Sequence, residues 1–255
     1  MNTIIITGAS SGIGREFAFA LDHIMGAKID EFWLIARRKD RLEELAATMH
    51  HDTRIFAMDV NDADAVESLT DELALRSGRV CMLINAAGYG KIGSFSDNRL
   101  SDVEGMIRLN VEALSRMTKV ILPFMVRGGR IIQMASSASF MPQTGFVVYA
   151  ASKAYVRSFS LGLNEELTDR RITVTAVCPG PVDTEFFRIA EEHGSTLAIK
   201  KYFMTTPQKV VRKALADSYH RRAESVPTLS MRALQVLCKL LPHTFLLRLF
   251  RLFVR

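Results

Sequence analysis

Short apolar segments alternate with longer segments of helical periodicity along most of the chain. The apolar segments lie near residues 3–7, 32–36, 54–58, 80–84, 130–135 and 172–177, and the helical segments near 13–25, 40–50, 62–77, 101–127 and 149–169. The strand centres, such as IIIT, FWLIA and VCMLI, are almost continuously hydrophobic, as expected of strands that helices cover on both faces. The alternation therefore predicts an α/β fold with one doubly wound parallel sheet and helices on both faces.

Composition indicates one domain with a C-terminal extension. The 255 residues are 48% apolar and 24% charged, the usual balance of a soluble protein with a large core. No repeat or linker interrupts residues 1–226, which we interpret as one domain, and residues 227–255 form an apolar and basic extension. The first apolar segment lacks a basic leader and is expected to be a strand rather than a secretory signal.

Cysteine content and charge exclude several classes of protein. Cys81, Cys178 and Cys238 form no CxxC pair, so we expect no disulfide framework, no metal and a reducing, cytoplasmic compartment. The net charge is +6, but residues 209–255 hold ten Lys and Arg against two acids, which leaves 23 bases and 25 acids elsewhere. The basic charge belongs to the tail, so the main body is not expected to bind nucleic acid.

A glycine-rich loop joins the first predicted strand to the first predicted helix. Residues 7–14 read TGASSGIG, and glycines at positions 8, 12 and 14 allow a tight turn and a close backbone approach to a ligand. Backbone N–H groups and the positive helix end at this place suit a nucleotide pyrophosphate. The loop therefore predicts a dinucleotide site in a Rossmann-like fold, with the spacing GxxxGxG.

That spacing and four further motifs resemble the short-chain dehydrogenase/reductase family over residues 2–190. The motifs are NAAG at 85–88, an asparagine at 110 in the helical segment near 101–127, a serine at 136 that ends the fifth strand with YAASK at 149–153, and PGPVDT at 179–184. The resemblance implies a nicotinamide cofactor bound by Gly8, Ser10, Ser11, Gly12, Ile13, Gly14, Val60, Asn85, Ala86, Gly88, Tyr149, Lys153, Pro179, Gly180, Val182 and Thr184.

The end of the second strand predicts NADP(H) as the cofactor. A carboxylate there would accept a hydrogen bond from the 2′-hydroxyl of the adenosine ribose. The chain instead has Ala36 followed by Arg37 and Arg38, and a guanidinium binds a 2′-phosphate. The alternative is that both arginines begin a solvated helix. We assign that role to Arg38 and the phosphate contact to Arg37. Asp59 resembles the family's adenine-contacting acid, although a helix cap would explain it equally well.

Tyr149 and Lys153 are one helical turn apart, so both side chains can project from one face. A phenol has a pKa near ~10, and a neighbouring ammonium is expected to lower that value toward neutral pH. The resemblance implies that Lys153 also holds the nicotinamide ribose.

Ser136 and Asn110 complete the predicted catalytic group. Ser136 lies thirteen positions before Tyr149 and seven after Gly129, and both counts match the family, in which this hydroxyl holds the substrate oxygen. Asn110 resembles the family's asparagine that holds a relay water for the lysine. Its alternative role is to satisfy helix backbone.

Apolar residues between the catalytic serine and tyrosine and after Thr184 predict a bulky apolar substrate of steroid or fatty-acyl type. They are Phe140, Met141, Pro142, Phe146, Phe186, Phe187 and Ile189, with Tyr89 and Met204 as further candidates. The alternative is that they form core. The expected activity is hydride transfer between NADP(H) and a carbonyl or secondary alcohol. The alternatives are a non-catalytic NADP(H)-binding regulator and a membrane-associated interaction protein.

The tail from Leu229 to Arg255 is apolar, with Arg248, Arg251 and Arg255 at helical spacing, and Pro242 divides it. The thirteen residues beyond Pro242 are too few to span a bilayer, which needs about 20. The tail has two possible roles, and the sequence does not choose between them. Residues 229–255 either make a peripheral membrane contact or pack on the domain or a sister subunit. The family resemblance implies a homodimer or homotetramer, formed through the two long helices near 101–127 and 149–169.

Overall fold

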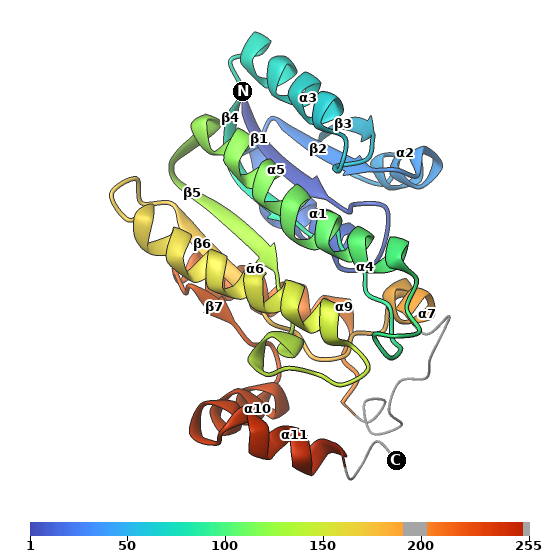
Figure 1. Cartoon of the computed structure of the whole chain (residues 1–255). Helices are drawn as coiled ribbons and strands as arrows, with labels where there is room; N and C mark the ends of the chain where they lie inside the picture. Colours follow the sequence, from blue (N-terminus) through green and yellow to red (C-terminus); the bar gives the residue numbers. More distant parts are fainter. Residues whose placement is uncertain (191–202, 252–255) are drawn as a thin grey trace.

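Seven strands form one parallel sheet in the order β3-β2-β1-β4-β5-β6-β7 in this computed structural model, which describes residues 1–190 and 203–251 (Figure 1). The strands are β1 (Asn2–Thr7), β2 (Glu31–Ala36), β3 (Asp52–Ala57), β4 (Arg79–Asn85), β5 (Met125–Met134), β6 (Thr173–Val177) and β7 (Glu224–Ser225). The predicted doubly wound α/β fold is confirmed.

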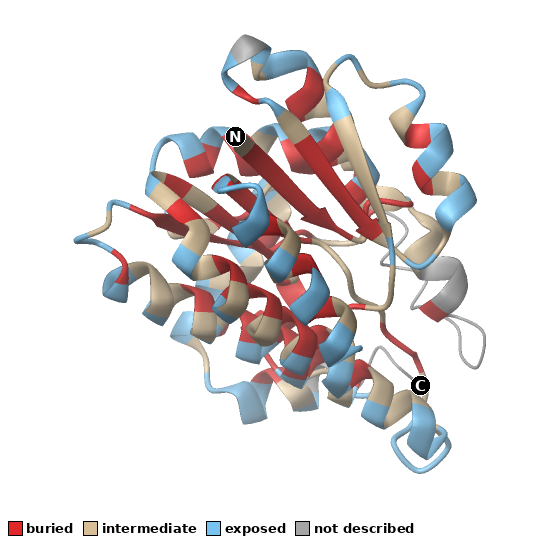
Figure 2. Ribbon diagram, turned by 90° about the horizontal axis from the view of Figure 1, so that it is seen from above, coloured by how far each residue is buried: buried red, intermediate tan, exposed pale blue. Residues whose placement is uncertain are grey.

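Helices cover both faces of the sheet. They are α1 (Gly12–Ile24), α2 (Lys39–Ala46), α3 (Ala63–Leu75), α4 (Leu100–Ile107), α5 (Leu114–Ile121), α6 (Val147–Glu166), α7 (Glu185–Ala190), α9 (Pro207–Tyr219), α10 (Leu229–Leu240) and α11 (His243–Arg251). Apolar residues of α1, α2 and α9 pack in one core cluster, and those of α3 and α5 in another. Figure 2 shows the buried strands between these layers. The continuous hydrophobicity of the strands follows from this two-sided burial.

The predicted helix over residues 101–127 ends earlier in the structure. A π-helical segment, Arg108–Ala113, separates α4 from α5, and a 3-10 turn at Leu122–Phe124 leads into β5, which begins at Met125. Pro123 in that turn has no backbone N–H for helix hydrogen bonding. The helix prediction was therefore wrong at its end, and within the continuous helix Asn110 lies in the π segment.

The C-terminal extension packs against its own domain. Met231 and Cys238 of α10 and Leu246 of α11 are buried in one cluster with Phe140 and Val226. Pro242 separates the two helices as predicted. No helix within residues 1–190 and 203–251 is long and apolar enough to cross a membrane.

Asp22 ties the end of α1 to the start of β3. Its buried carboxylate accepts hydrogen bonds from the backbone N–H groups of His50 and His51 and lies 2.8 Å from Nδ1 of each ring. Burial alone would raise the pKa of Asp22, but these hydrogen bonds together lower it. Nε2 of His51 lies 2.9 Å from the carbonyl oxygen of Gly26. That bond and the one to Asp22 raise the pKa of His51, because only the imidazolium donates from both nitrogens.

His51 is therefore expected to stabilise the fold more at acidic than at alkaline pH. The pKa of His51 in the folded state lies above its unfolded value of about 6.5. The contribution of His51 to the free energy of unfolding is therefore complete below about pH 6.5 and is lost as the pH rises through the folded pKa. Wild type is expected to have a higher Tm than His51→Gln at pH 6, and this difference is expected to shrink by about 2–4 °C by about pH 9. A loss of ~1 kcal/mol in the free energy of unfolding gives a Tm change of this size. His220→Gln, at an exposed position, is the control. Equal Tm of wild type and His51→Gln at pH 6 would contradict the assignment.

Candidate active site

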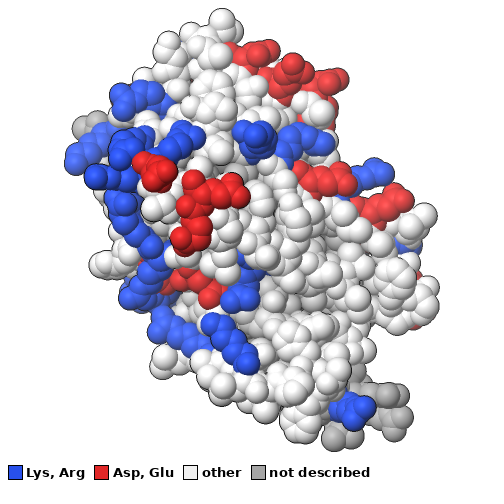
Figure 3. All heavy atoms as spheres, turned by 60° about the vertical axis from the view of Figure 1, so that its left-hand side comes forward, with Lys and Arg blue, Asp and Glu red and all other residues white. Residues whose placement is uncertain are grey.

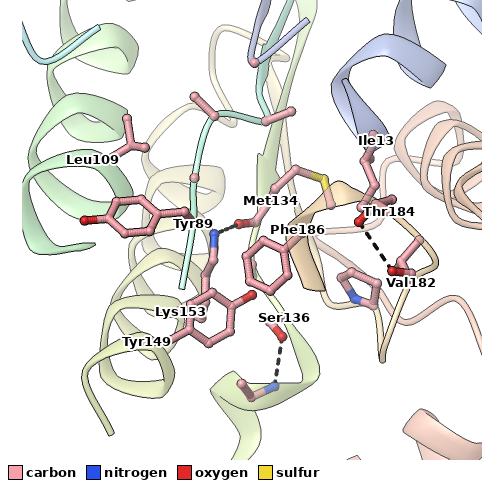
Figure 4. A pocket seen from close by; sticks show the side chains of 18 of the residues that line it. Ile13, Tyr89, Leu109, Met134, Ser136, Tyr149, Lys153, Val182, Thr184 and Phe186 are labelled. Atoms are coloured by element: carbon pink, nitrogen blue, oxygen red, sulfur yellow. Dashed lines mark hydrogen bonds between the residues drawn. The ribbon is translucent and has the colours of Figure 1, made fainter. Parts of the chain in front are cut away.

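A cavity of about 1160 Å³ opens at the carboxyl ends of the central strands. Its lining runs from the glycine-rich loop, past the ends of β4 and β5, to Met231 and Leu234 of α10 and Leu247 of α11. Figure 4 shows the part of this cavity around Tyr149. Ligands of open α/β sheets bind at this edge, where the chain crosses from one face to the other.

The glycine-rich loop is packed too tightly for side chains at two of its glycines. A Cβ on Gly14 would lie 2.3 Å from the carbonyl oxygen of Gly8, and a Cβ on Gly8 would lie 2.7 Å from the backbone nitrogen of Ala87. Gly8 and Gly12 have φ values of +69° and +53°, which glycine adopts most readily. Ser11, the N-cap of α1, makes no side-chain capping hydrogen bond within the described chain, so N–H groups of the first helical turn are available to an anion.

Tyr149 and Lys153 point from α6 into the cavity, as their spacing predicted (Figure 4). Both side chains are buried. The ammonium of Lys153 lies 5.7 Å from the centre of the Tyr149 ring and donates a hydrogen bond of 2.7 Å to the carbonyl oxygen of Met134. Phe146 stacks on the Tyr149 ring at a centroid distance of 4.2 Å. The phenol is therefore held between a cation and an apolar wall.

The protonation of this pair differs from the sequence-based expectation. Burial raises the pKa of Tyr149 to about 12, although a hydrogen bond with Ser136 lowers it in part. Burial also lowers the pKa of Lys153 to about 8. The expected lowering of the phenol pKa toward neutral pH is not met in this structure, because burial penalises the phenolate and the interaction with Ser136 offsets this only in part. At neutral pH Tyr149 is a protonated phenol, ready to donate a proton.

Ser136 is the serine that reaches the phenol. Its hydroxyl lies close enough to the phenol to lower the pKa of Tyr149 in part, and its Oγ accepts a hydrogen bond of 3.1 Å from the backbone N–H of Ala138. Ser139 instead donates to the backbone carbonyl oxygen of Ser136 and does not line the cavity. Ser137 lines the cavity, and its backbone N–H donates to Pro179. The two sequence counts therefore selected the serine that contacts Tyr149.

Asn110 is fully buried and does not line the cavity. Its Nδ2 donates to the carbonyl oxygen of Tyr89 at 2.9 Å and to Oγ of Ser152 at 3.0 Å, and its Oδ1 accepts from the N–H of Tyr89 at 3.1 Å. A Cβ on Gly88 would lie 2.9 Å from Oδ1 and 3.3 Å from Nζ of Lys153. Both amide hydrogens are thus used by protein groups, so Asn110 fixes the loop after β4 beside Lys153. These contacts agree with a structural role, and the relay-water role of Asn110 stays a prediction.

Asn85 also turns away from the cavity. Its Nδ2 donates to Oγ1 of Thr118 and to Oε1 of Gln133, both at 3.0 Å, and its Oδ1 has no hydrogen-bond partner among the described residues. Asn85 was predicted to bind the cofactor, but it does not line the cavity. Side chains alternate between the two faces of a strand, and that of Asn85 enters the layer beneath α5. Ala86 and Gly88, which follow, do line the cavity.

Two arginines after β2 line the cavity rather than one. Arg37 is exposed at its rim. Arg38 is the N-cap of α2, as predicted, and its side chain also donates to Oγ of Ser10 at 3.3 Å and to both carboxylate oxygens of Glu185. Asp59 lines the cavity and accepts from Asn61. The cap of α3 is Asp62, so the capping alternative for Asp59 is wrong.

The remaining predicted cofactor positions line the cavity, as follows: Ser10, Ser11, Gly12, Ile13, Val60, Pro179, Gly180, Val182 and Thr184. Oγ1 of Thr184 donates to the carbonyl oxygen of Val182 at 3.3 Å (Figure 4). A Cβ on Gly180 would lie 2.9 Å from the side chain of Met231. The extension therefore closes over the segment that follows β6.

The predicted substrate residues are only partly in the cavity wall. Met141, Pro142, Phe146, Phe186 and Tyr89 line it. Phe140 lies in the core cluster under α10, and Met204 is exposed and does not line the cavity. The side chains of Phe187 and Ile189 lie outside the described residues. Sequence reasoning missed the individual residues Met231, Leu234 and Leu247 because the amphipathic pattern of the tail does not show which apolar side chains reach the cavity.

A Rossmann-like sheet with a Ser–Tyr–Lys group beside a glycine-rich phosphate loop defines an oxidoreductase, and comparisons with known proteins agree. The family model described as short chain dehydrogenase matches residues 2–194. Sulfoacetaldehyde reductase 2 of Chromohalobacter salexigens is 35% identical over 80% of this chain and 82% of its own. The chain belongs to the short-chain dehydrogenase/reductase family.

Solved structures of the family superpose closely. A short-chain dehydrogenase from Sphingobium yanoikuyae in complex with NADPH has a TM-score of 0.77 at 29% identity, covering 95% of this chain and 97% of its own. A short-chain dehydrogenase/reductase from Burkholderia phymatum in complex with NAD has a TM-score of 0.78 at 21% identity, covering 92% and 91%. Because cofactors differ among such structures, the cofactor of this chain must be argued from its own residues.

Proposed function

We propose that this protein transfers hydride between NADP(H) and the carbonyl or secondary alcohol carbon of a bulky apolar substrate. The observation that carries the proposal is the phenol of Tyr149, close to Ser136 and Lys153, in the wall of a cavity that continues to the glycine-rich loop. The chain fits the cofactor, because Gly8 and Gly14 let the loop pack closely on the backbone after β4 and on itself, which leaves the N–H groups at the start of α1 facing the cavity for a pyrophosphate.

Each residue of the group has a distinct role in the proposed reaction. The nicotinamide, when bound, supplies or accepts the hydride. In carbonyl reduction Ser136 holds the substrate oxygen, and Tyr149 donates its phenolic proton to that oxygen as the alcohol forms. The ammonium of Lys153 stabilises the phenolate that remains, and Asn110 positions the loop beside it. In alcohol oxidation the proton returns to Oη of Tyr149.

The electrostatics at the end of β2 favour NADP(H) over NAD(H). Ala36 offers no carboxylate to a ribose 2′-hydroxyl, while Arg37 and Arg38 line the same part of the cavity. A charge-assisted hydrogen bond contributes about 1.5–3 kcal/mol. We expect Arg37→Ala to weaken NADPH binding about 10- to 100-fold and to leave NADH binding unchanged, measured by fluorescence titration. Lys119→Ala, at an exposed position on α5, controls for the loss of one positive charge. Equal turnover of wild type with NADH and NADPH would contradict the cofactor assignment.

An apolar lining supports a bulky hydrophobic substrate of steroid or fatty-acyl type. Beyond Tyr149 the wall is formed by Met141, Phe146, Phe186, Met231, Leu234 and Leu247. Burial of such side chains against an apolar ligand stabilises a complex by about 25 cal/mol per Å². Apolar ketones of increasing size are therefore expected to show decreasing KM.

The outer face of the C-terminal helices is proposed as a peripheral membrane contact. Leu240 and Phe245 are 75% and 53% exposed, and Arg248 is exposed on the same helix as Phe245. Figure 3 shows few charged side chains where these helices lie, at the lower end of the molecule. An amphipathic surface of this type binds anionic bilayers. The inner face packs on the domain, so the two roles first considered for the tail are compatible.

Vesicle sedimentation tests this contact. Wild type is expected to sediment with anionic vesicles, and the double variant Leu240→Ser, Phe245→Ser is expected to stay in the supernatant. Leu75→Ser, at an exposed apolar position on α3, is the matched control. Failure of wild type to sediment would end the membrane proposal. Light scattering of the same protein without vesicles measures the expected homodimer or homotetramer.

A further inference from the structure

The carboxylate of Glu185 occupies a cluster of cationic donors at the adenosine end of the cavity. Nη1 of Arg38 lies 3.1 and 2.9 Å from the two carboxylate oxygens, and Nη2 of Arg38 lies 3.0 Å from Oε2. Nη1 of Arg41 lies 3.1 Å from Oε2. The hydrogen bonds from Arg38 lower the pKa of Glu185, so the carboxylate is charged at neutral pH.

This donor set has the chemistry of a phosphate monoester site. Two guanidinium groups converge on one carboxylate, and Nη2 of Arg38 also donates to Oγ of Ser10. Forked guanidinium contacts suit phosphate as well as carboxylate. In this structure the anion that Arg38 and Arg41 bind is the carboxylate of Glu185.

The location of the cluster matches the adenosine ribose. Ser10 belongs to the glycine-rich loop, and Arg38 follows β2 by two residues. Ser10, Arg38 and Glu185 line the same cavity as Ala36 and Arg37, and the end of this strand faces the ribose 2′ position in Rossmann folds. The Glu185 carboxylate therefore lies where an additional phosphate on that ribose would be bound.

We propose that Glu185 competes with the 2′-phosphate of NADP(H) for Arg38 and Arg41 and so sets the affinity and selectivity for that cofactor. The inference rests on the proposed use of NADP(H). Binding of the 2′-phosphate must break the contacts of Glu185, because two anions cannot share the same guanidinium fork without repulsion. A 5′-phosphorylated adenosine without a 2′-phosphate leaves these contacts intact.

The probe is adenosine 2′,5′-bisphosphate, compared with adenosine 5′-monophosphate by isothermal titration calorimetry on the full chain. Glu185→Gln keeps the size of the side chain and removes its charge. We expect this variant to bind the bisphosphate about three- to tenfold more tightly than wild type, the scale expected for two partly exposed ion pairs. Binding of the monophosphate is expected to be unchanged. Glu43→Gln, which removes an exposed charge from α2, is the matched control and is expected to match wild type.

A second variant separates competition from a general charge effect. Arg38→Ala is expected to weaken bisphosphate binding, and the gain from Glu185→Gln is expected to shrink in the Arg38→Ala background, because the two side chains act on the same site. Glu185→Ala is expected to change affinity in the same direction as Glu185→Gln.

Two outcomes would overturn the proposal, and they differ in what else they contradict. If Glu185→Gln and Glu185→Ala leave bisphosphate affinity unchanged while Arg38→Ala weakens it, the competition is wrong and NADP(H) use stands. If wild type and all Glu185 variants bind the bisphosphate no more tightly than the monophosphate, the use of NADP(H) itself is contradicted.

Discussion

Replacement of Tyr149 by Phe is expected to lower kcat by about 10²–10⁴, the usual contribution of general acid–base catalysis. The variant lacks only the hydroxyl, so the ring still stacks on Phe146 and the fold and NADPH affinity are expected to be retained. Steady-state turnover of an apolar ketone, with NADPH binding measured in parallel, gives both quantities.

Tyr155→Phe is the matched control for this variant. Tyr155 lies on the same helix, is 41% exposed and pairs its hydroxyl with Oγ of Ser115 at 3.0 Å. It is expected to show wild-type turnover. Wild-type turnover of Tyr149→Phe would disprove the role of the phenol, whereas a loss of NADPH binding would show that the substitution acts on the cofactor site instead.

Replacement of Gly14 by Ala is expected to abolish tight cofactor binding and to destabilise the fold. The added Cβ would lie 2.3 Å from the carbonyl oxygen and 2.8 Å from the carbonyl carbon of Gly8. Both are backbone atoms, so the loop must move to relieve the clash. Overpacking of this type costs about 1–3 kcal/mol, which corresponds to a fall in Tm of at least about 2–4 °C. Thermal unfolding and NADPH titration measure the two effects.

Gly162→Ala is the control for the same chemical change. Gly162 lies in α6, and a Cβ there would meet no described heavy atom within 4 Å. Alanine in a helix interior is expected to stabilise the fold by about 0.5–1 kcal/mol relative to glycine. If Gly14→Ala retained wild-type NADPH affinity and Tm, the close backbone approach at the loop would not be needed for binding.

The sheet was predictable because its inner strands β1, β2, β4 and β6 are mostly buried and therefore have continuous apolar sequences. The π segment Arg108–Ala113 within the predicted helix over residues 101–127 could not be predicted, because hydrophobic periodicity does not show a local change of hydrogen-bond register. Strand β7 is two residues long, too short for a periodic signal, and its pairing with β6 depends on tertiary structure.

The site was predictable where residues are held by local spacing. Tyr149 and Lys153 share a helix face, and the counts from Tyr149 and Gly129 identified Ser136. The contact of Arg38 with Glu185 joins residues far apart in sequence, so no local pattern reveals it. The pKa of Tyr149 depends on burial, and residue spacing shows a neighbouring charge but not the degree of desolvation.

The central claim is that this chain uses the Tyr149 phenol to transfer hydride between NADP(H) and an apolar carbonyl. The most direct measurement is NADPH consumption by wild type with a panel of apolar ketones of increasing size. The account predicts turnover that is faster with NADPH than with NADH and highest for the bulky ketones. Tight NADPH binding without turnover of any ketone, or of any corresponding alcohol with NADP⁺, would contradict it.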